Sequence, residues 1–304
     1  MTSLSEPSWD FYRTFLAVLE HGSLSAAARD LGLTQPTVGR HIDALEQSVG
    51  AELFTRSQQG LLPTDAALVL KPYAETLAST TAALLRAATG ARDKVSGTVR
   101  ISASEVIGTE VLPSILAGLQ AQYPELIVEL SASDIVEDLL QREADIAVRM
   151  VAPAQGALLA RHVGAISLGL FAHRSYIERH GKPETIKELH QHKLIGFDRQ
   201  TAYVRTMLKR YPLLDGISFS FRSDHSIALH NALRSGIGIG FYQIPLANRD
   251  ANLLRLLPEM EVSIETWIVM HENLKTSPRC RVTFDALVAG LLDYIKGNNL
   301  EGRA

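Results

Sequence analysis

The chain of 304 residues has a single cysteine, Cys280, and therefore cannot form an internal disulfide. Such scarcity is typical of proteins in a reducing compartment. No run of about 18 apolar residues occurs, which excludes a membrane-spanning helix of ordinary length. The N-terminal segment, MTSLSEPSWDF, has neither the cationic start nor the apolar core of a secretion signal. We therefore expect a cytoplasmic protein with no membrane partner.

Signatures of catalysis and metal binding are also missing. No serine-elbow motif and no phosphate-binding loop with lysine occurs. The glycines of RSGIGIG follow a helical pattern and precede a strand pattern, the reverse of the order in a dinucleotide-binding loop. His190 and His192 lack a nearby third ligand, and Cys280 heads an apolar helical stripe, which indicates a core thiol. We predict no cofactor, no metal site and no catalytic site, so the protein is not expected to be an enzyme.

What the chain does contain is, at residues 24–46, a pair of short helical patterns joined by a turn: LSAAARDLGLTQPTVGRHIDALE. Gly32 permits the positive φ that ends the first helix. Thr34 is suited to cap the second helix, and Pro36 fits its first turn. This layout is typical of a helix-turn-helix that binds DNA. An ordinary three-helix domain with a solvated face is the alternative.

The second of these helices has two different faces. Val38, Ile42 and Leu45 recur at spacings of four and three, which predicts a buried stripe. Off this stripe lie glutamine, threonine, arginine and histidine side chains, which are the groups that hydrogen-bond to base edges in a major groove. The exposed face therefore favours DNA recognition.

Residues 65–93 predict a further, longer helix. Tyr73, Leu77 and Leu84 lie on a seam whose members alternate spacings of four and three, as in a coiled coil. Pro72 must kink this helix or start its main part. We predict that the seam pairs two subunits; the alternative is a monomeric linker helix that lies on its own domain.

From Val99 onward, strand and helix patterns alternate, first over residues 98–150 and again over residues 168–243. Consecutive units of this kind predict a mainly parallel sheet with right-handed crossovers. A strand at residues 263–272 and the helix headed by Cys280 then return to the first unit. Two lobes joined by two crossing strands enclose a cleft, and ligands bind beyond the carboxyl ends of the strands.

Polar side chains follow several of these strands. Ser104 and Ser133 each precede a helix, where hydroxyl and free N–H groups can hold an anion; simple helix capping is the alternative. Arg149 suits a carboxylate, although an internal salt bridge would also explain it. The predicted effector-binding residues are Ser104, Ser133, Arg149, Asp198, Tyr203 and Asp224. Because the helix N-termini at the two serines and Arg149 would give the cleft a positive potential, the expected ligand is a small anionic metabolite. The two aspartates would accept hydrogen bonds from its hydroxyl or amino groups, and the tyrosine would cover its apolar part.

The chain resembles LysR-type transcriptional regulators over nearly its whole length. The resemblance is carried by WDFYRTFLAVLEHGSLSAAARDLGLTQPTVGRHIDALEQSVGAELFTR, followed by the wing LLPTDAA. Gly39 stands where the family often has serine, and Ala67 where it often has glycine. The resemblance implies that the linker helix pairs subunits, that two dimers form a tetramer which bends DNA, and that Ser104 and Ser133 touch the effector.

DNA contacts are expected despite an unusual charge. Residues 1–93 hold seven basic and ten acidic residues, a formal net charge of −3, whereas DNA-binding domains are usually basic. Phosphate contacts must therefore be few and local, which makes an oligomer necessary for useful affinity. The predicted DNA-binding residues are Ser23, Ser25, Thr34, Gln35, Pro36, Thr37, Arg40, His41 and Arg56.

We therefore predict an α+β multidomain fold with three parts. They are a winged helix-turn-helix domain at 1–64, a linker and dimerisation helix at 65–93, and a two-lobed, periplasmic-binding-protein-like effector domain at 94–304. Lobe I is expected at about 94–165 and 266–304, and lobe II at about 166–265. The function expected is that of a ligand-responsive regulator with operator DNA, a small-molecule effector and further copies of itself as partners. A solute-binding protein without regulatory function is the alternative, but it would explain only the C-terminal part.

Overall fold

The computed structural model describes residues 7–57, 60–89, 95–134, 144–152, 158–198, 205, 209 and 218–297. These residues form two compact units, the first ending at Ala88 and the second beginning at Thr89. Each unit has a hydrophobic core of its own. The described helices include none that is long and apolar enough to cross a membrane.

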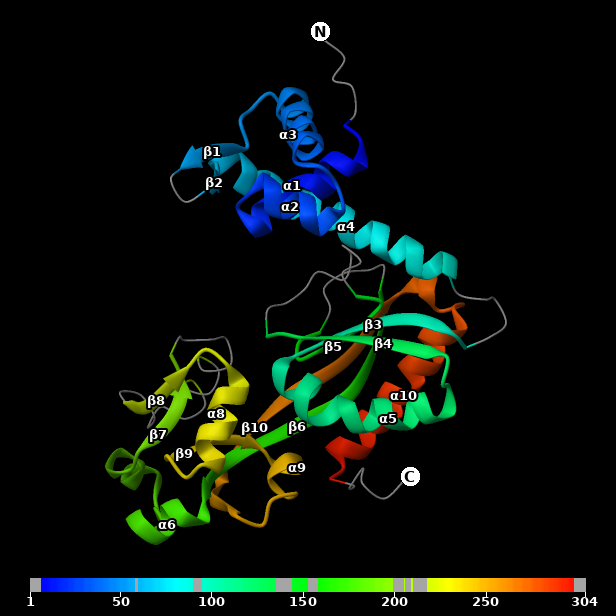
Figure 1. Cartoon of the computed structure of the whole chain (residues 1–304). Coiled ribbons are helices and arrows are strands. Elements are labelled where there is room, and N and C mark those ends of the chain that lie inside the picture. Colours follow the sequence, from blue (N-terminus) through cyan, green and yellow to red (C-terminus); the bar gives the residue numbers. More distant parts are fainter. Residues whose placement is uncertain are drawn as a thin grey trace. The chain divides into compact units, whose positions relative to one another are not determined.

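The first unit is a three-helix domain with a two-stranded wing (Figure 1). Its elements are α1 (Trp9–His21), α2 (Leu24–Leu31), α3 (Gln35–Val49), β1 (Phe54–Ser57), β2 (Gly60–Pro63) and α4 (Asp65–Thr89). Gly32 ends α2 in the left-handed conformation, and the Thr34 hydroxyl accepts a hydrogen bond from Thr37 N at 3.4 Å. The two helices and their cap are thus confirmed. The stripe of α3 is buried against Phe15 and Val18 of α1, which is why the helices pack as one domain.

Helix α4 continues through Pro72 instead of beginning there. Of the two alternatives expected for Pro72, a kink or a helix start, the structure excludes the start: the helix begins at Asp65, where the Thr64 hydroxyl accepts a hydrogen bond from Ala67 N at 3.2 Å. Ala67 and Ala74 pack into the core of the first unit. The predicted seam residues lie on the exposed surface of the same helix.

The second unit is built on one eight-stranded sheet with the order β4-β3-β5-β10-β6-β9-β7-β8. Its strands are β3 (Gly97–Ala103), β4 (Leu126–Ala132), β5 (Ile146–Arg149), β6 (Leu158–His173), β7 (Leu194–Phe197), β8 (Phe219–Ser223), β9 (Ile239–Gln243) and β10 (Leu253–His271). The two long strands β6 and β10 run side by side through the middle of the sheet in Figure 1.

The sheet is mixed, which corrects the prediction of a mainly parallel one. Strands β3, β4 and β5 are parallel to one another, as are β7, β8 and β9. However, β6 and β10 pair antiparallel with each other and with the strands beside them. One crossing strand leaves the first lobe and the other returns to it, so the two must run in opposite directions.

Helices cover the sheet and complete the two lobes. The described helices of the second unit are η1 (Ile107–Val111), α5 (Leu112–Gln122), α6 (Arg174–His180), η3 (Ile186–Gln191), α8 (Ser226–Arg234), α9 (Ile244–Ala247), η5 (Glu272–Leu274) and α10 (Pro278–Ile295). We call β3–β5 with η1, α5 and α10 lobe I, and β7–β9 with α6, α8 and α9 lobe II. One core cluster joins Leu116 and Leu287 of lobe I to Leu233 and Tyr242 of lobe II. Residues 135–143, which belong to the strand and helix alternation predicted over residues 98–150, lie outside the described residues.

Candidate DNA-binding surface and effector site

The N-terminal end of α3 presents a group of polar side chains on the surface of the first unit. Ser25 Oγ of α2 donates a hydrogen bond to Gln35 Oε1 at 2.9 Å. The hydroxyls of Thr34 and Thr37 lie 2.8 Å apart, and Arg40 Nη2 is 3.5 Å from Thr37 Oγ1. These two hydrogen-bonded groups form a polar face at the start of α3, suited to contact with bases and phosphates. Ser23 precedes α2 with no side-chain capping bond, and Pro36 lies in the first turn of α3.

His41 belongs to a different environment. Its Nδ1 lies 2.9 Å from Thr14 Oγ1, and its ring packs on Phe11 with ring centroids 5.1 Å apart. Because the Thr14 hydroxyl donates its hydrogen to Asp10 O at 2.7 Å, His41 Nδ1 must be the donor to Thr14. The imidazole thus ties α3 to α1, and this placement does not favour the base contact predicted for it.

The wing is held to the helices by two contacts that were not predicted from the sequence. Glu46 Oε1, near the end of α3, accepts hydrogen bonds from Leu53 N at 2.7 Å and Phe54 N at 3.3 Å. Leu61 N of β2 donates to Gly22 O at the end of α1, at 2.8 Å. Glu46, one of the acidic residues that lower the net charge of this domain, therefore stabilises the position of the wing. Arg56 is exposed on β1.

In the second unit, the fold brings together three of the predicted effector residues. Ser104 and Ser133 follow the neighbouring parallel strands β3 and β4, and Ser133 N donates to Ala103 O at 2.9 Å. Arg149 ends β5 on the other side of β3, and its Nη1 donates to Ser102 Oγ at 3.1 Å. The guanidinium of Arg149 therefore lies against β3 near its carboxyl end, in lobe I.

The predicted residues of lobe II form a second group. Asp198 N, after β7, donates to Ser223 O at the end of β8, at 3.2 Å. Asp224 comes next along the chain and is exposed. Tyr203 lies outside the described residues.

The carboxylates of Glu105 and Asp134, which were not predicted as site residues, connect the segments after β3 and β4 to the start of α8, next to Asp224. Glu105 Oε1 accepts a hydrogen bond from His225 Nδ1 at 3.0 Å, and Glu105 Oε2 accepts one from Ser226 N at 2.9 Å. Asp134 Oδ2 accepts from Ser226 Oγ at 2.7 Å. The only sequence signal is that an acid directly follows each predicted effector serine.

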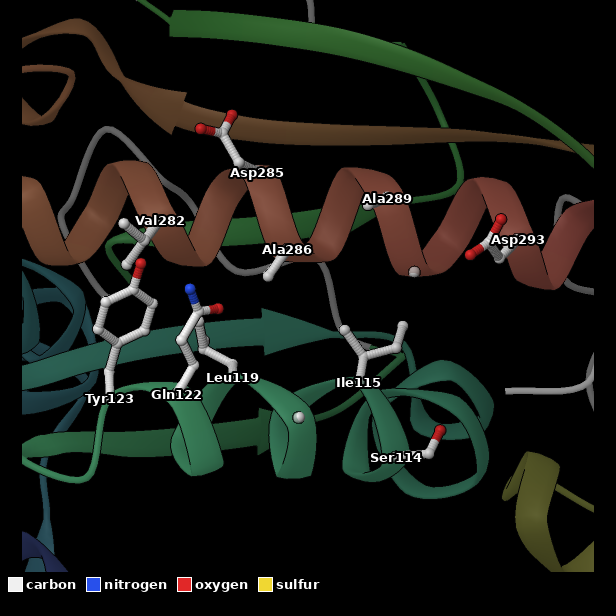
Figure 2. A pocket seen from close by; sticks show the side chains of 12 residues that line it. Ser114, Ile115, Leu119, Gln122, Tyr123, Val282, Asp285, Ala286, Ala289 and Asp293 are labelled. Atoms are coloured by element: carbon white, nitrogen blue, oxygen red, sulfur yellow. The ribbon is translucent and has the colours of Figure 1, made fainter. Parts of the chain in front are cut away.

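A groove of about 420 Å³ lies elsewhere in lobe I, between α5 and α10 (Figure 2). Ile115 and Leu119 of α5 face Ala286 of α10 across it. None of the predicted effector residues lines this groove. Among the described residues, no group of three or more His, Cys, Asp or Glu could hold a metal ion.

Comparison with known proteins identifies both units. Residues 9–68 match the family "Bacterial regulatory helix-turn-helix protein, lysR family", and residues 92–291 match "LysR substrate binding domain". The regulator CrgA of Neisseria meningitidis is 26% identical over 299 residues, which cover 95% of this chain and 97% of that protein. A Xanthomonas campestris regulator is 32% identical over 182 residues, but these span only 60% of this chain and 53% of that protein.

Solved structures show the same fold. The CrgA structure is 25% identical, covers 93% of this chain and 98% of that chain, and superposes with a TM-score of 0.58. The structure of CbnR, a LysR family transcriptional regulator, superposes with a TM-score of 0.68 at 19% identity and covers 93% of this chain and 99% of that one.

Proposed function

The chain belongs to the LysR family of bacterial transcriptional regulators, and from this premise we propose that it binds operator DNA as an oligomer and responds to a small anionic metabolite. Members of the family are DNA-binding regulators with an effector-binding domain, and they are not enzymes. Because operator DNA is the target, the proposed place of action is the cytoplasm.

The observation that carries this proposal is the polar face at the start of α3. Thr34, Gln35, Thr37 and Arg40 gather on the surface of a helix whose opposite stripe is buried. With this face in a major groove, Arg40 reaches a base edge and the neighbouring hydroxyls reach bases or phosphates. Arg56, exposed on the wing, contacts the backbone of the same half-site.

The oligomer proposal is supported by the exposed seam of α4. Tyr73 is 68% exposed, Leu77 43% and Leu84 61% in the single chain. Large apolar side chains along one helix face are stabilised by a partner helix that removes them from water. A dimer through α4 places two recognition helices on two half-sites, and two dimers make the proposed tetramer.

The effector proposal is supported by the donors at the strand ends of lobe I. Arg149 supplies a positive charge, and Ser104 and Ser133 supply hydroxyl groups at the ends of the neighbouring strands β3 and β4. Glu105 and Asp134 add negative charge nearby and already accept hydrogen bonds from residues at the start of α8. An anionic ligand is therefore better placed against Arg149 than against α8.

Two measurements test the function. The full-length protein should retard a specific subset of genomic fragments in a gel-shift experiment, and footprinting should then show two protected half-sites. Calorimetry of a metabolite library against the same protein should yield at least one small anion. If no genomic fragment is retarded, the proposed DNA binding is refuted. If every ligand found is neutral or cationic, the proposed anionic effector is refuted.

A further inference from the structure

Helix α8 of lobe II is held at both ends by one short segment of lobe I. At its start, the Glu105 carboxylate accepts the hydrogen bonds from His225 Nδ1 and Ser226 N. At its end, Arg234 Nη2 donates to Glu110 Oε1 at 2.8 Å. Glu105 lies two residues before the π-helical turn η1 and Glu110 lies within it, and turns of this kind are often found at functional sites. The position of this turn therefore sets the position of α8.

The two carboxylates at the start of α8 support each other. Asp134 Oδ1 accepts a hydrogen bond from Glu105 N at 3.0 Å, while its Oδ2 accepts the Ser226 hydroxyl. The Glu105 side chain is only 17% exposed, so little water is available to replace its partners. Hydrogen bonds to a carboxylate are roughly twice as strong as neutral ones, and a negative charge is favoured at a helix N-terminus.

We propose that Glu105 and Asp134 are positioning residues that latch α8 onto lobe I, and that the effector acts by releasing this latch. The latch rests on the hydrogen bonds above, whereas its release rests on the proposed function. Glu105 directly follows Ser104, and Asp134 directly follows Ser133. A ligand that moves either serine must therefore displace a carboxylate that holds the other lobe. Displacement of the carboxylate by a bound effector then shifts the protein from one arrangement of the two lobes to another.

The latch is also sensitive to pH. The pKa of His225 is raised by its hydrogen bond to Glu105, by the charge of Glu105 and by the charges of Asp224 and Asp134. A raised pKa means that the imidazolium form stabilises the contact, and that this contribution is lost as the pH rises through that pKa. On the buried face of the helix, burial and the nearby Arg234 lower the pKa of His230 to about 3, so it stays neutral. The pH response therefore arises at the start of α8.

Hydrogen exchange on the intact full-length protein, without ligand or DNA, tests the latch. In Glu105→Gln the first turn of α8 should lose protection about tenfold, while α6, capped within lobe II by His173, should not change. Glu129→Gln is the matched control, because Glu129 is an exposed lobe I carboxylate paired with Arg100 instead of α8. Asp134→Asn should loosen the same turn if Glu105→Gln fails to fold. Unchanged protection of this turn in the folded variants would overturn the latch.

The pH profile separates a latch from a simple helix cap. In the wild type, the protection factor of the first turn should fall as the pH is raised from about 6 to 8. His225→Asn should abolish this dependence while the bond from Ser226 N to Glu105 remains. A dependence that persists in His225→Asn would contradict the assigned group.

A DNA-bending experiment tests the release. On a fragment that the wild type binds, Glu105→Gln without any metabolite should change the mobility of the bent complex, and Glu129→Gln should not. If the Glu105→Gln protein loosens α8 but bends DNA as the wild type does, the proposed coupling between the latch and the effector response is overturned. Failure of the wild type to bind any fragment would instead refute the proposed function, and the exchange result would still decide the latch.

Discussion

Replacing both Leu77 and Leu84 by aspartate should dissociate the oligomer while leaving each chain folded. Both side chains are already largely exposed in the single chain, 43% and 61%, so their replacement removes little from the core of the first unit. In a dimer through α4, by contrast, the same positions would lie between two helices. The double variant therefore separates association from folding.

The size of the effect follows from the exposed fractions. Full burial of a leucine side chain stabilises by about 1.5–3 kcal/mol, and roughly half of each side chain remains to be covered, so each contributes about 0.75–1.5 kcal/mol. Two chains bring four such leucines, which amounts to about 3–6 kcal/mol before any cost of burying charge. Since about 1.4 kcal/mol is tenfold in affinity, the dimer dissociation constant should rise about a hundredfold or more.

Sedimentation over a range of protein concentrations measures this change, and circular dichroism confirms that the helices remain. Leu85→Asp is a matched control, because Leu85 lies off the seam and is 59% exposed, close to the exposure of Leu84. It should leave the oligomer largely intact. A double variant with the wild-type oligomer and operator affinity, or a control that dissociates equally, would refute pairing through this seam.

Four further substitutions test the two candidate sites. Arg40→Ala should lose about 1–3 kcal/mol at the operator and relax discrimination at one base pair, whereas Arg56→Ala should weaken all sequences alike; binding selections on random duplexes measure both. His41→Ala should leave base preference unchanged but reduce the free energy of unfolding of the first unit by about 1–3 kcal/mol in denaturant titrations, because it removes a hydrogen bond and a ring contact. Arg149→Ala should weaken an anionic metabolite about tenfold to a hundredfold in calorimetry, because it removes a charged donor.

Three of these expectations can each be contradicted by one specific result. Full operator affinity in a folded Arg40→Ala protein would remove that residue from base recognition. A changed base preference in His41→Ala, with no loss of stability, would restore the DNA contact expected from the sequence. Metabolites bound equally tightly by Arg149→Ala would place the effector away from the end of β5.

The helix-turn-helix was predictable because its signals are local. Gly32, Thr34 and Pro36 act on backbone within a few residues of themselves, and the stripe of α3 follows from helical periodicity alone. Most strands of the second unit were predictable for the same reason, because alternation of strand and helix patterns needs no knowledge of partners. However, β6 (Leu158–His173) and β10 (Leu253–His271) begin well before the patterns expected from residues 168 and 263. The likeness to LysR-type regulators extended this reading to the whole chain.

Other features depend on contacts between distant parts of the chain. His41 is held at α1 by Thr14, 27 residues away, although the helical pattern alone left it on the polar face. The directions of β6 and β10 follow from their passage between two lobes, which no single strand pattern contains. Glu105 meets Ser226 across 121 residues of sequence, and its place at the start of α8 exists only because the fold of the second unit brings together the segments that follow β3 and β8. Local propensity identified the elements, whereas only the tertiary structure decided which polar groups compensate one another's burial.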